Sequence, residues 1–327
     1  MTKPDQIRRH TLSDGDVSVT LLSLGCITQD WQVPLQGRRV PVVLGYQDPR
    51  AYLRNPYWIG VIAGRVANRI SGAGFRMNGE NFRLPANQPP NHLHGGDRGL
   101  SRQNWEMEAD GARSVQLRLV SPDGDQGYPG RLDLTVTIRL KGHTLTYEME
   151  ARSDRPTPVN LAQHSYYSLG AESIRDFEVT LDADRYTPND PDLIPTGQIE
   201  PLTGRPFDFR QGRSIGDADP EGQGLDMNFV LNAGGIRVAG NGLSLEIETD
   251  QPCVQLYTAT YLKPHEVPLA GQSHRSFAGL CLEPQGFPNA INTTGFPVSM
   301  VTPDAHYRQI SKVSIAQIQQ PSADKII

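Results

Sequence analysis

Three ionisable side chains stand where the sequence would let them take part in chemistry. His94 lies in a Leu-His-Gly-Gly turn, and the two glycines permit a ligand to approach the backbone closely. His164 is followed by Ser165 and two tyrosines, which offer hydrogen-bond partners to an imidazole. Glu283 ends an apolar run, where a carboxylate is costly unless it has a partner or a role. Together with Arg69, these side chains suit proton transfer on a neutral, hydroxyl-rich substrate.

Each of these residues also has an ordinary structural interpretation. A lone histidine such as His94 is commonly solvated, and His164 would serve equally well as a core histidine that hydrogen-bonds its neighbours. Arg65 and Arg69, which are four positions apart, would both fit an exposed surface. Asp226 would fit a turn. Glu283 is the sharpest signal, because the end of a buried strand suits a site built on a rigid scaffold.

Several other kinds of site are not indicated. The chain contains no His-Glu-x-x-His, Cys-x-x-Cys, Gly-x-Ser-x-Gly or phosphate-loop motif. His92 and His94 would share one face of a strand and could bind a metal, but no clear third ligand stands nearby, so no metal is expected. Lys and Arg number 31 against 36 Asp and Glu, for a net charge of −5, which argues against a nucleic-acid partner.

Cysteine content and hydropathy indicate a reduced, soluble protein. The 3 cysteines are too few and too scattered for a disulfide framework, and we expect Cys26, Cys253 and Cys281 to be buried thiols. Residues 1–10 are polar and lack the apolar core of a signal peptide. No stretch approaches the ~18 apolar residues of a membrane span. We therefore expect a cytoplasmic protein without a membrane partner.

Alternation of apolar and polar residues is the dominant pattern along the chain. Leu132–Leu140 alternates without interruption, which predicts an antiparallel strand that is buried on one face. Residues 145–151 and 243–249 repeat the pattern, and residues 115–119 do so over a shorter span. The sequence therefore favours sheets over helices.

Turn signals separate these strands. Asn78-Gly79 and Lys141-Gly142 each predict a hairpin. Asp48–Leu53 predicts a short helical turn, with an aspartate cap followed by proline. No run of 12 or more residues has a convincing helical period.

No linker, repeat or low-complexity segment divides the chain. The Gly-rich residues 218–225 are followed at once by strand-like sequence. We therefore predict one all-β domain over residues 1–327, folded as a large antiparallel β-sandwich. The polar tail from Gln319 onward is expected to fray.

The order and spacing of many short motifs resemble those of the aldose 1-epimerases, or galactose mutarotases. Any one of the motifs alone would be weak, but together they extend over nearly the whole chain. They include Leu22–Gly25, Val42–Tyr46, Asn55–Tyr57, Gly64–Ile70, Asn91–Gly96, Ser121–Gly124, Pro158–Leu161, Ile194–Gly197 and Leu282–Gln285.

The resemblance implies a β-sandwich of the galactose mutarotase type, a monosaccharide substrate and no cofactor. It also implies roles: Glu283 is expected to be the general base and His164 the general acid. His94, Arg69 and Asp226 are expected to bind the substrate. Reference pKa values of ~4.3 for Glu and ~6.5 for His predict that an unperturbed pair works best between those values.

The chain departs from the family pattern at several positions. It has Gln163 where the family often has Asn, and Met227 where the family often has His. It also has Ser168 in a stretch that is often Tyr-Phe-Asn-Leu in the family. The general acid, the general base and Asp226 are unaffected. The departures leave open which aldose is preferred, and the sequence does not indicate an oligomeric state.

Three other functions remain possible from the residues alone. A glycoside hydrolase would need two carboxylates, for which Glu283 and Asp226 would be the pair. A non-catalytic sugar-binding or sensory module could use the same fold, although the presence of both His164 and Glu283 argues against it. An epimerase for a phosphorylated sugar would need additional basic residues in the cleft.

Overall fold

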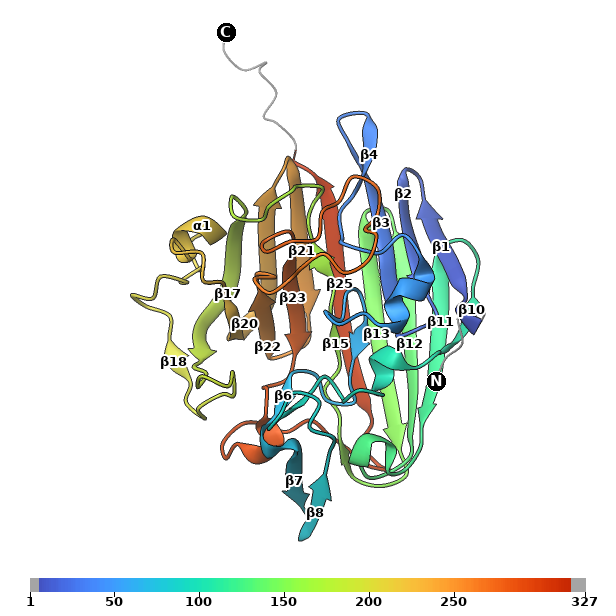
Figure 1. The fold of residues 1–327 in the computed structure, drawn as a ribbon, viewed down its shortest axis with the longest axis vertical. Helices are drawn as coiled ribbons and strands as arrows, with labels where there is room; N and C mark the ends of the chain where they lie inside the picture. The colour runs from blue at the N-terminus through green and yellow to red at the C-terminus, as the bar shows by residue number, and fades with distance from the viewer. Residues whose placement is uncertain (1–5, 319–327) are drawn as a thin grey trace.

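The computed structural model describes residues 6–318, which form an all-β structure (Figure 1). The expected fraying from Gln319 lies outside these residues. Most strands belong to one 13-stranded antiparallel sheet. Its main path runs β10 (Glu106–Ala109), β11 (Ser114–Ser121), β12 (Leu132–Lys141), β13 (Thr144–Ser153), β25 (Tyr307–Gln317), β21 (Leu243–Thr249), β20 (Asp226–Gly240), β22 (Cys253–Tyr257), β23 (Leu280–Gln285) and β16 (Tyr166–Tyr167).

The remaining strands of this sheet lie beyond β20. Strand β17 (Glu178–Thr187) pairs with β20 and carries the short strands β18 (Glu200–Pro201) and β19 (Arg213–Ser214). A β-bulge interrupts the register between β17 and β20 near Ala183, which bends the sheet at this edge.

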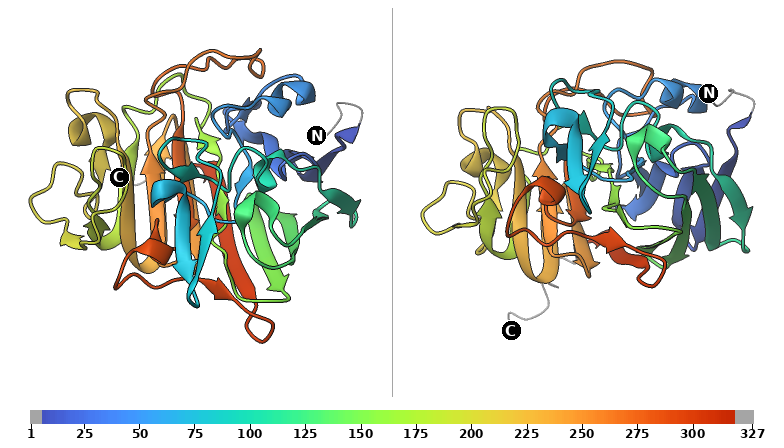
Figure 2. Two further views of the ribbon diagram at one scale, coloured as in Figure 1. Left: turned by 60° about the horizontal axis from the view of Figure 1, so that its bottom comes forward. Right: turned by 90° about the horizontal axis from the view of Figure 1, so that it is seen from below.

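A smaller sheet packs on the large one and completes the predicted sandwich. It contains β1 (Arg9–Asp14), β2 (Val17–Leu22), β3 (Ile27–Leu35) and β4 (Arg38–Pro41). The views in Figures 1 and 2 place it over the part of the large sheet that holds β12, β13 and β25. Buried side chains from both sheets, such as Trp31 and Val136, form one main hydrophobic core. Burial of this apolar surface is the dominant stabilising contribution.

The alternating segments form strands where the sequence predicted them. In β12 the residues Leu132, Leu134 and Val136 are buried, whereas Asp133 and Lys141 are exposed. The predictions for residues 115–119, 145–151 and 243–249 are confirmed by β11, β13 and β21. This alternation directs one face of each strand into the main core.

The predicted turns are also confirmed. Asn78 and Gly79 both have positive φ, 50° and 85°, and join β7 (Gly74–Met77) to β8 (Glu80–Arg83). Asp48 caps a 3₁₀ helix over Pro49–Leu53, and its side chain accepts a hydrogen bond from the backbone N–H of Arg50 at 2.9 Å. The sequence did not predict α1 (Ile215–Ala218), the one α-helix in residues 6–318.

Short paired segments join the loops that cover one face of the large sheet. Strand β5 (Ile62–Ala63) pairs with β15 (Ala162–Gln163), β6 (Arg69–Ile70) with β9 (His92–Leu93), and β14 (Thr157–Pro158) with β24 (Met300–Val301). Further 3₁₀ turns cover Ser71–Ala73, Leu100–Arg102, Asp125–Gly127 and Ala290–Asn292. Strands β6, β7 and β8 lie at the lower end of the molecule in Figure 1.

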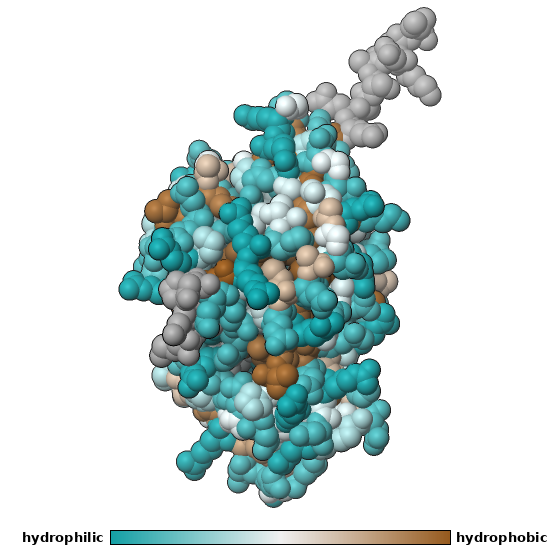
Figure 3. All heavy atoms as spheres, turned by 90° about the vertical axis from the view of Figure 1, so that its right-hand side faces the viewer, coloured by the Kyte–Doolittle hydropathy of each residue, from teal (hydrophilic) through white to brown (hydrophobic). Residues whose placement is uncertain are grey.

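The surface and the thiols agree with the expectations from composition. The face seen in Figure 3 is largely hydrophilic, with apolar residues in small groups. The three cysteines, Cys26, Cys253 and Cys281, are buried and free. Within residues 6–318, no helix has both the length and the apolar character needed to span a bilayer. The single-domain organisation over residues 1–327 stays a prediction.

Candidate active site

Strand register places a polar row on one face of the large sheet. On β23, Leu280 and Leu282 enter the main core, so Glu283 lies on the opposite face. Glu283 is paired in register with Gln255 on β22, and Gln255 is paired with Asn228 on β20. Residues directly opposite each other on antiparallel strands share a face. The carboxylate therefore stands beside an amide in the middle of a rigid sheet.

His164 lies between β15 and β16 and faces this row. Its Nε2 is 3.4 Å from Oε1 of Glu283, and both side chains are almost completely buried. Its backbone is held on both sides, because its N–H donates to the carbonyl of Val61 at 2.8 Å and its carbonyl accepts from Gly60 at 2.9 Å. On the other side of the ring, Nδ1 is 3.7 Å from Sγ of Cys281.

His94 lies in the turn after β9, with a positive φ of 50°. The turn requires glycine at Gly95, because a Cβ there would lie 1.7 Å from the carbonyl oxygen of Gly64. The Nδ1 of His94 accepts the backbone N–H of Asn68 at 3.2 Å, so the neutral ring carries its proton on Nε2. The rings of His94 and His164 meet edge to face, with centroids 5.2 Å apart.

Arg69 and Asp226 complete the predicted set. Arg69, on β6, places Nη1 3.9 Å from Oδ2 of Asp226, and its Nε donates to Oε1 of Gln88 at 2.7 Å. Asp226, at the start of β20, accepts a 2.5 Å hydrogen bond from Nε2 of Gln255. The structure therefore brings Arg69, His94, His164, Asp226 and Glu283 to one place, although they come from distant parts of the chain.

The environment of the site shifts the pKa of each of its carboxyl and imidazole groups. Burial raises the pKa of Glu283 well above its usual value; the charge of Asp226 adds to this, whereas Arg69 opposes it. Burial lowers the pKa of His164 to about 4. Burial also raises the pKa of Asp226, against the effects of Arg69 and Gln255. The pKa of His94 is lowered well below its usual value by burial and by neighbouring His164 and Arg69.

The same residues would be the place for a metal ion, if one were bound. Ligand atoms of His94, His164 and Glu283 all lie within 4.8 Å of one another. A metal on Nε2 of His94 would have to displace its proton and break the Nδ1 hydrogen bond from Asn68. The fixed tautomer makes His94 a hydrogen-bond donor, so the residues fit proton transfer better than metal coordination.

His92 and Arg65 have structural roles instead. Nδ1 of His92 lies 2.7 Å from the carbonyl oxygen of Pro85 and Nε2 lies 3.0 Å from the hydroxyl of Tyr128, so the alternative of a His92–His94 metal pair is wrong. Arg65 is 2% exposed, which contradicts a surface position. Its guanidinium donates to Oγ of Ser121 and to the backbone carbonyls of Ser121, Pro122, Pro129 and Gly130.

Sequence reasoning missed two side chains of the site. Gln255 stands alone as a polar residue in the apolar strand Cys253–Tyr257, the same signal that identified Glu283. Trp58 packs on His94, with ring centroids 5.1 Å apart. No pattern within the segment around Trp58 connects it with His94, because the two meet only through the tertiary fold.

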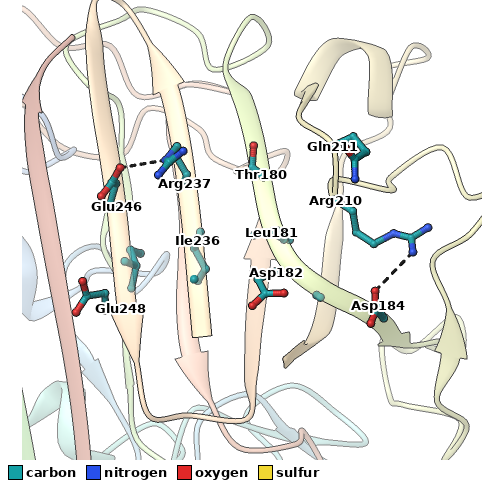
Figure 4. A pocket seen from close by; sticks show the side chains of 13 residues that line it. Thr180, Leu181, Asp182, Asp184, Arg210, Gln211, Ile236, Arg237, Glu246 and Glu248 are labelled. Carbon is teal, nitrogen blue, oxygen red and sulfur yellow. Dashed lines mark hydrogen bonds and ion pairs between the residues drawn. The ribbon is translucent and has the colours of Figure 1, made fainter. Parts of the chain in front are cut away.

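Of the predicted site residues, Asp226 lines a cleft at the surface. This cleft of about 390 Å³ opens between the ends of β17, β20 and β22, and Tyr257 and Tyr261 also line it. A second groove, of about 530 Å³, lies over β17, β20 and β21 (Figure 4). Charged side chains line that groove, including Arg210 paired with Asp184. It contains none of the predicted site residues.

Comparisons with known proteins identify the family of this chain. The family model for aldose 1-epimerase matches residues 8–314. The galactose mutarotase of Mus musculus is 38% identical, with 95% of each chain covered, and the aldose 1-epimerase of Escherichia coli K12 is 31% identical, with 85% of this chain and 86% of that protein covered. Among solved structures, the GalM/aldose epimerase homologue from C. elegans has a TM-score of 0.91 at 26% identity, covering 96% of this chain and 100% of that chain. Galactose 1-epimerase from Lactobacillus acidophilus has a TM-score of 0.84 at 27% identity, covering 94% of both. This chain belongs to the aldose 1-epimerase family.

Proposed function

We propose that this protein interconverts the α and β anomers of free aldoses, with Glu283 as the general base and His164 as the general acid. The observation that carries the assignment is the 3.4 Å approach of Nε2 of His164 to Oε1 of Glu283 in a buried site. A hemiacetal needs one group to accept a proton and one to donate a proton in order to open. Family membership supports the same isomerase activity.

The reaction begins with proton transfer at both ends of the hemiacetal. The Glu283 carboxylate takes the proton of the C1 hydroxyl, and the C1 oxygen forms the carbonyl of an aldehyde. The electrons of the C1–O5 bond move to O5, which takes a proton from the His164 imidazolium. Rotation about C1–C2 then presents the other carbonyl face, and the two residues exchange roles on closure. No electron or group is transferred, so the chemistry requires no cofactor.

Ring opening needs the pair of Glu283 and His164 to hold one titratable proton between them. Because burial raises the pKa of Glu283 and lowers that of His164, the resting proton lies on the carboxyl. Transfer of this proton to His164 produces the carboxylate and the imidazolium that open the ring. The two groups titrate as one coupled unit, since they are in direct contact.

The remaining residues of the proposal hold the sugar. His94 offers its Nε2–H, Arg69 its guanidinium and Asp226 its carboxylate to ring hydroxyls. Asp226 is held by Gln255 and lines the cleft, so it would contact the part of the sugar away from C1. Relatives that are 36–38% identical are named galactose mutarotases, and we propose galactose among the substrates.

Two details favour this function over the alternatives. The hydrolase pair would consist of Glu283 and Asp226, but Asp226 already accepts a hydrogen bond from Gln255 and faces Arg69, whereas His164 stands beside Glu283 as the acid that ring opening needs. A phosphorylated sugar would need additional basic residues, but Arg69 is the one arginine or lysine among the five site residues, and Asp226 partly offsets its charge. A cytoplasmic location belongs to the proposal, and it is supported by the buried free thiols, which are typical of a reducing compartment.

Polarimetry tests the activity. Freshly dissolved α-anomers of glucose, galactose, xylose and arabinose would be followed with and without the protein, and the spontaneous rate subtracted. We expect accelerated mutarotation of at least one aldose, without glycoside cleavage in a parallel assay. No acceleration with any of the four sugars would contradict the proposal.

A further inference from the structure

Trp58 packs against His94, and His94 in turn packs against His164, the proposed general acid. Trp58 lies in the loop between the 3₁₀ helix Pro49–Leu53 and β5 (Ile62–Ala63), and its φ is positive, 52°. Its ring packs on His94 with centroids 5.1 Å apart and an interplanar angle of 50°. His94 in turn meets His164 at 5.2 Å. The indole is therefore within reach of a molecule held by the two imidazoles.

The loop that carries Trp58 is fastened at several points. The amide of Asn55 donates to the carbonyl of Ile59 at 3.0 Å and accepts the N–H of Ile59 at 2.9 Å. The N–H of Trp58 donates to the carbonyl of Asn55 at 3.2 Å. Arg102 donates to the carbonyls of Arg54 and Asn55 from outside the loop. A side chain fixed in this way loses little conformational freedom when it binds a ligand.

The indole N–H of Trp58 is buried and has no hydrogen-bond partner within residues 6–318. By contrast, Nε1 of Trp105 donates to the carbonyl of Leu100 at 3.1 Å. An indole nitrogen is a donor only, and a buried donor is normally paired. At a site for a hydroxyl-rich molecule, an acceptor on that molecule is the natural partner.

We propose that the indole N–H of Trp58 donates a hydrogen bond to a sugar hydroxyl beside the reacting bond and so helps to determine specificity. This inference rests on the proposed function. Glu283 and His164 would hold the C1 hydroxyl and O5, so a group next to them meets substituents of the two flanking carbons. The partner is therefore the C2 hydroxyl or the C6 hydroxyl.

Substitution of Trp58 by phenylalanine removes the donor and keeps an aromatic ring against His94. The values of kcat and KM would be measured for glucose, 2-deoxyglucose, which lacks the C2 hydroxyl, and xylose, which lacks C6. A lost neutral hydrogen bond is expected to lower kcat/KM for glucose about 3- to 10-fold in Trp58→Phe. With the sugar that lacks the partner hydroxyl, wild type and variant should agree. An equal loss with all three sugars would mean that Trp58 only packs, and would overturn the proposal.

Trp31 provides the matched control. Its Nε1 is also buried without a partner in the described part of the chain, but it lies in the main core. Trp31→Phe should lower the melting temperature and leave the ratios between sugars unchanged. Selective loss with glucose in Trp31→Phe would show that the effect is not local to the site, and would contradict the proposal.

A second measurement does not depend on the folding of Trp58→Phe. The 3 tryptophans give separate indole N–H signals in a ¹⁵N-labelled protein, and phenylalanine variants of Trp31 and Trp105 assign Trp58 by elimination. Glucose should shift the Trp58 signal, and the sugar that lacks the partner hydroxyl, 2-deoxyglucose or xylose, should shift it less. An unmoved signal at saturating glucose would overturn the inference while mutarotation persists. Absence of mutarotation in the wild type would instead overturn the proposed function, and this inference with it.

Discussion

Nε2 of His164 lies 3.4 Å from Oε1 of Glu283, and neither side chain is open to solvent. Burial of this pair has opposite effects on the two groups: the pKa of the carboxyl rises and that of the imidazole falls to about 4. Both shifts disfavour the charged forms. The pair can change from neutral to charged by moving one proton from Glu283 to His164. Ring opening uses the charged form and ring closure uses the neutral form, so the pair suits both steps.

This arrangement predicts a bell-shaped pH profile for kcat/KM. Below about pH 4, His164 becomes protonated while Glu283 still carries its proton, so neither group can act as the base and activity falls. Above the raised pKa of Glu283, the pair loses its last proton, so no acid remains. Polarimetric rates from about pH 3 to about pH 10, with the buffer rate subtracted, test this. Loss of activity on acidification with a midpoint near the ordinary histidine value of ~6.5 would contradict it.

The two histidines are predicted to have separable roles. His164→Ala removes the acid and should lower kcat by ~10²-fold or more. His94→Ala removes a neutral donor and should mainly raise KM for the sugar. Steady-state kinetics with one aldose distinguish these effects. If His94→Ala abolished turnover while His164→Ala stayed active, the roles would have to be exchanged.

Activity is predicted to be independent of metal. The tautomer of His94 is set by the N–H of Asn68, and proton transfer within the pair is sufficient for ring opening. Dialysis against a chelator should leave the rate unchanged. A loss of activity that added zinc restored would show that His94, His164 and Glu283 hold an ion.

Arg65 is predicted to stabilise the protein without taking part in the reaction. Arg65→Met would leave several backbone carbonyls of residues 121–130 without their charged donor, which should cost about 3 kcal/mol or more of the free energy of unfolding. Urea denaturation measures this, and kcat of the folded variant should be unchanged. Arg118, an exposed residue paired with Glu108, is the control, and Arg118→Met should cost less than about 1 kcal/mol. An equal cost for both variants would contradict the assignment.

The strands were predictable because their signal is local. Leu132–Leu140 alternates along one strand, and Asn78-Gly79 has the residues that a tight hairpin turn requires. The four-residue helix Ile215–Ala218 was missed because one turn contains too few residues to show a helical period. Pairing of distant strands, such as β13 with β25, is not encoded in either segment alone.

The site was predictable in part for the same reason. Glu283 is visible as a charge in an apolar strand, but its partner His164 is more than a hundred positions away. Arg65 and Arg69 are alike in the sequence. In the structure, Arg65 donates to backbone carbonyls such as that of Pro129, whereas Arg69 faces Asp226. Reference pKa values placed the carboxyl on the acid side of the pH profile. Burial, which depends on the whole fold, reverses that order.

The most direct test of the central claim is the mutarotation rate of Glu283→Gln. The substitution preserves the shape of the side chain and removes the proton acceptor. Polarimetry with fresh α-glucose or α-galactose would compare it with the wild type, and circular dichroism would establish that the fold is intact. We expect kcat to fall at least ~10²-fold in a folded protein. A folded Glu283→Gln variant with a near-normal rate would contradict the assignment of Glu283 as the general base.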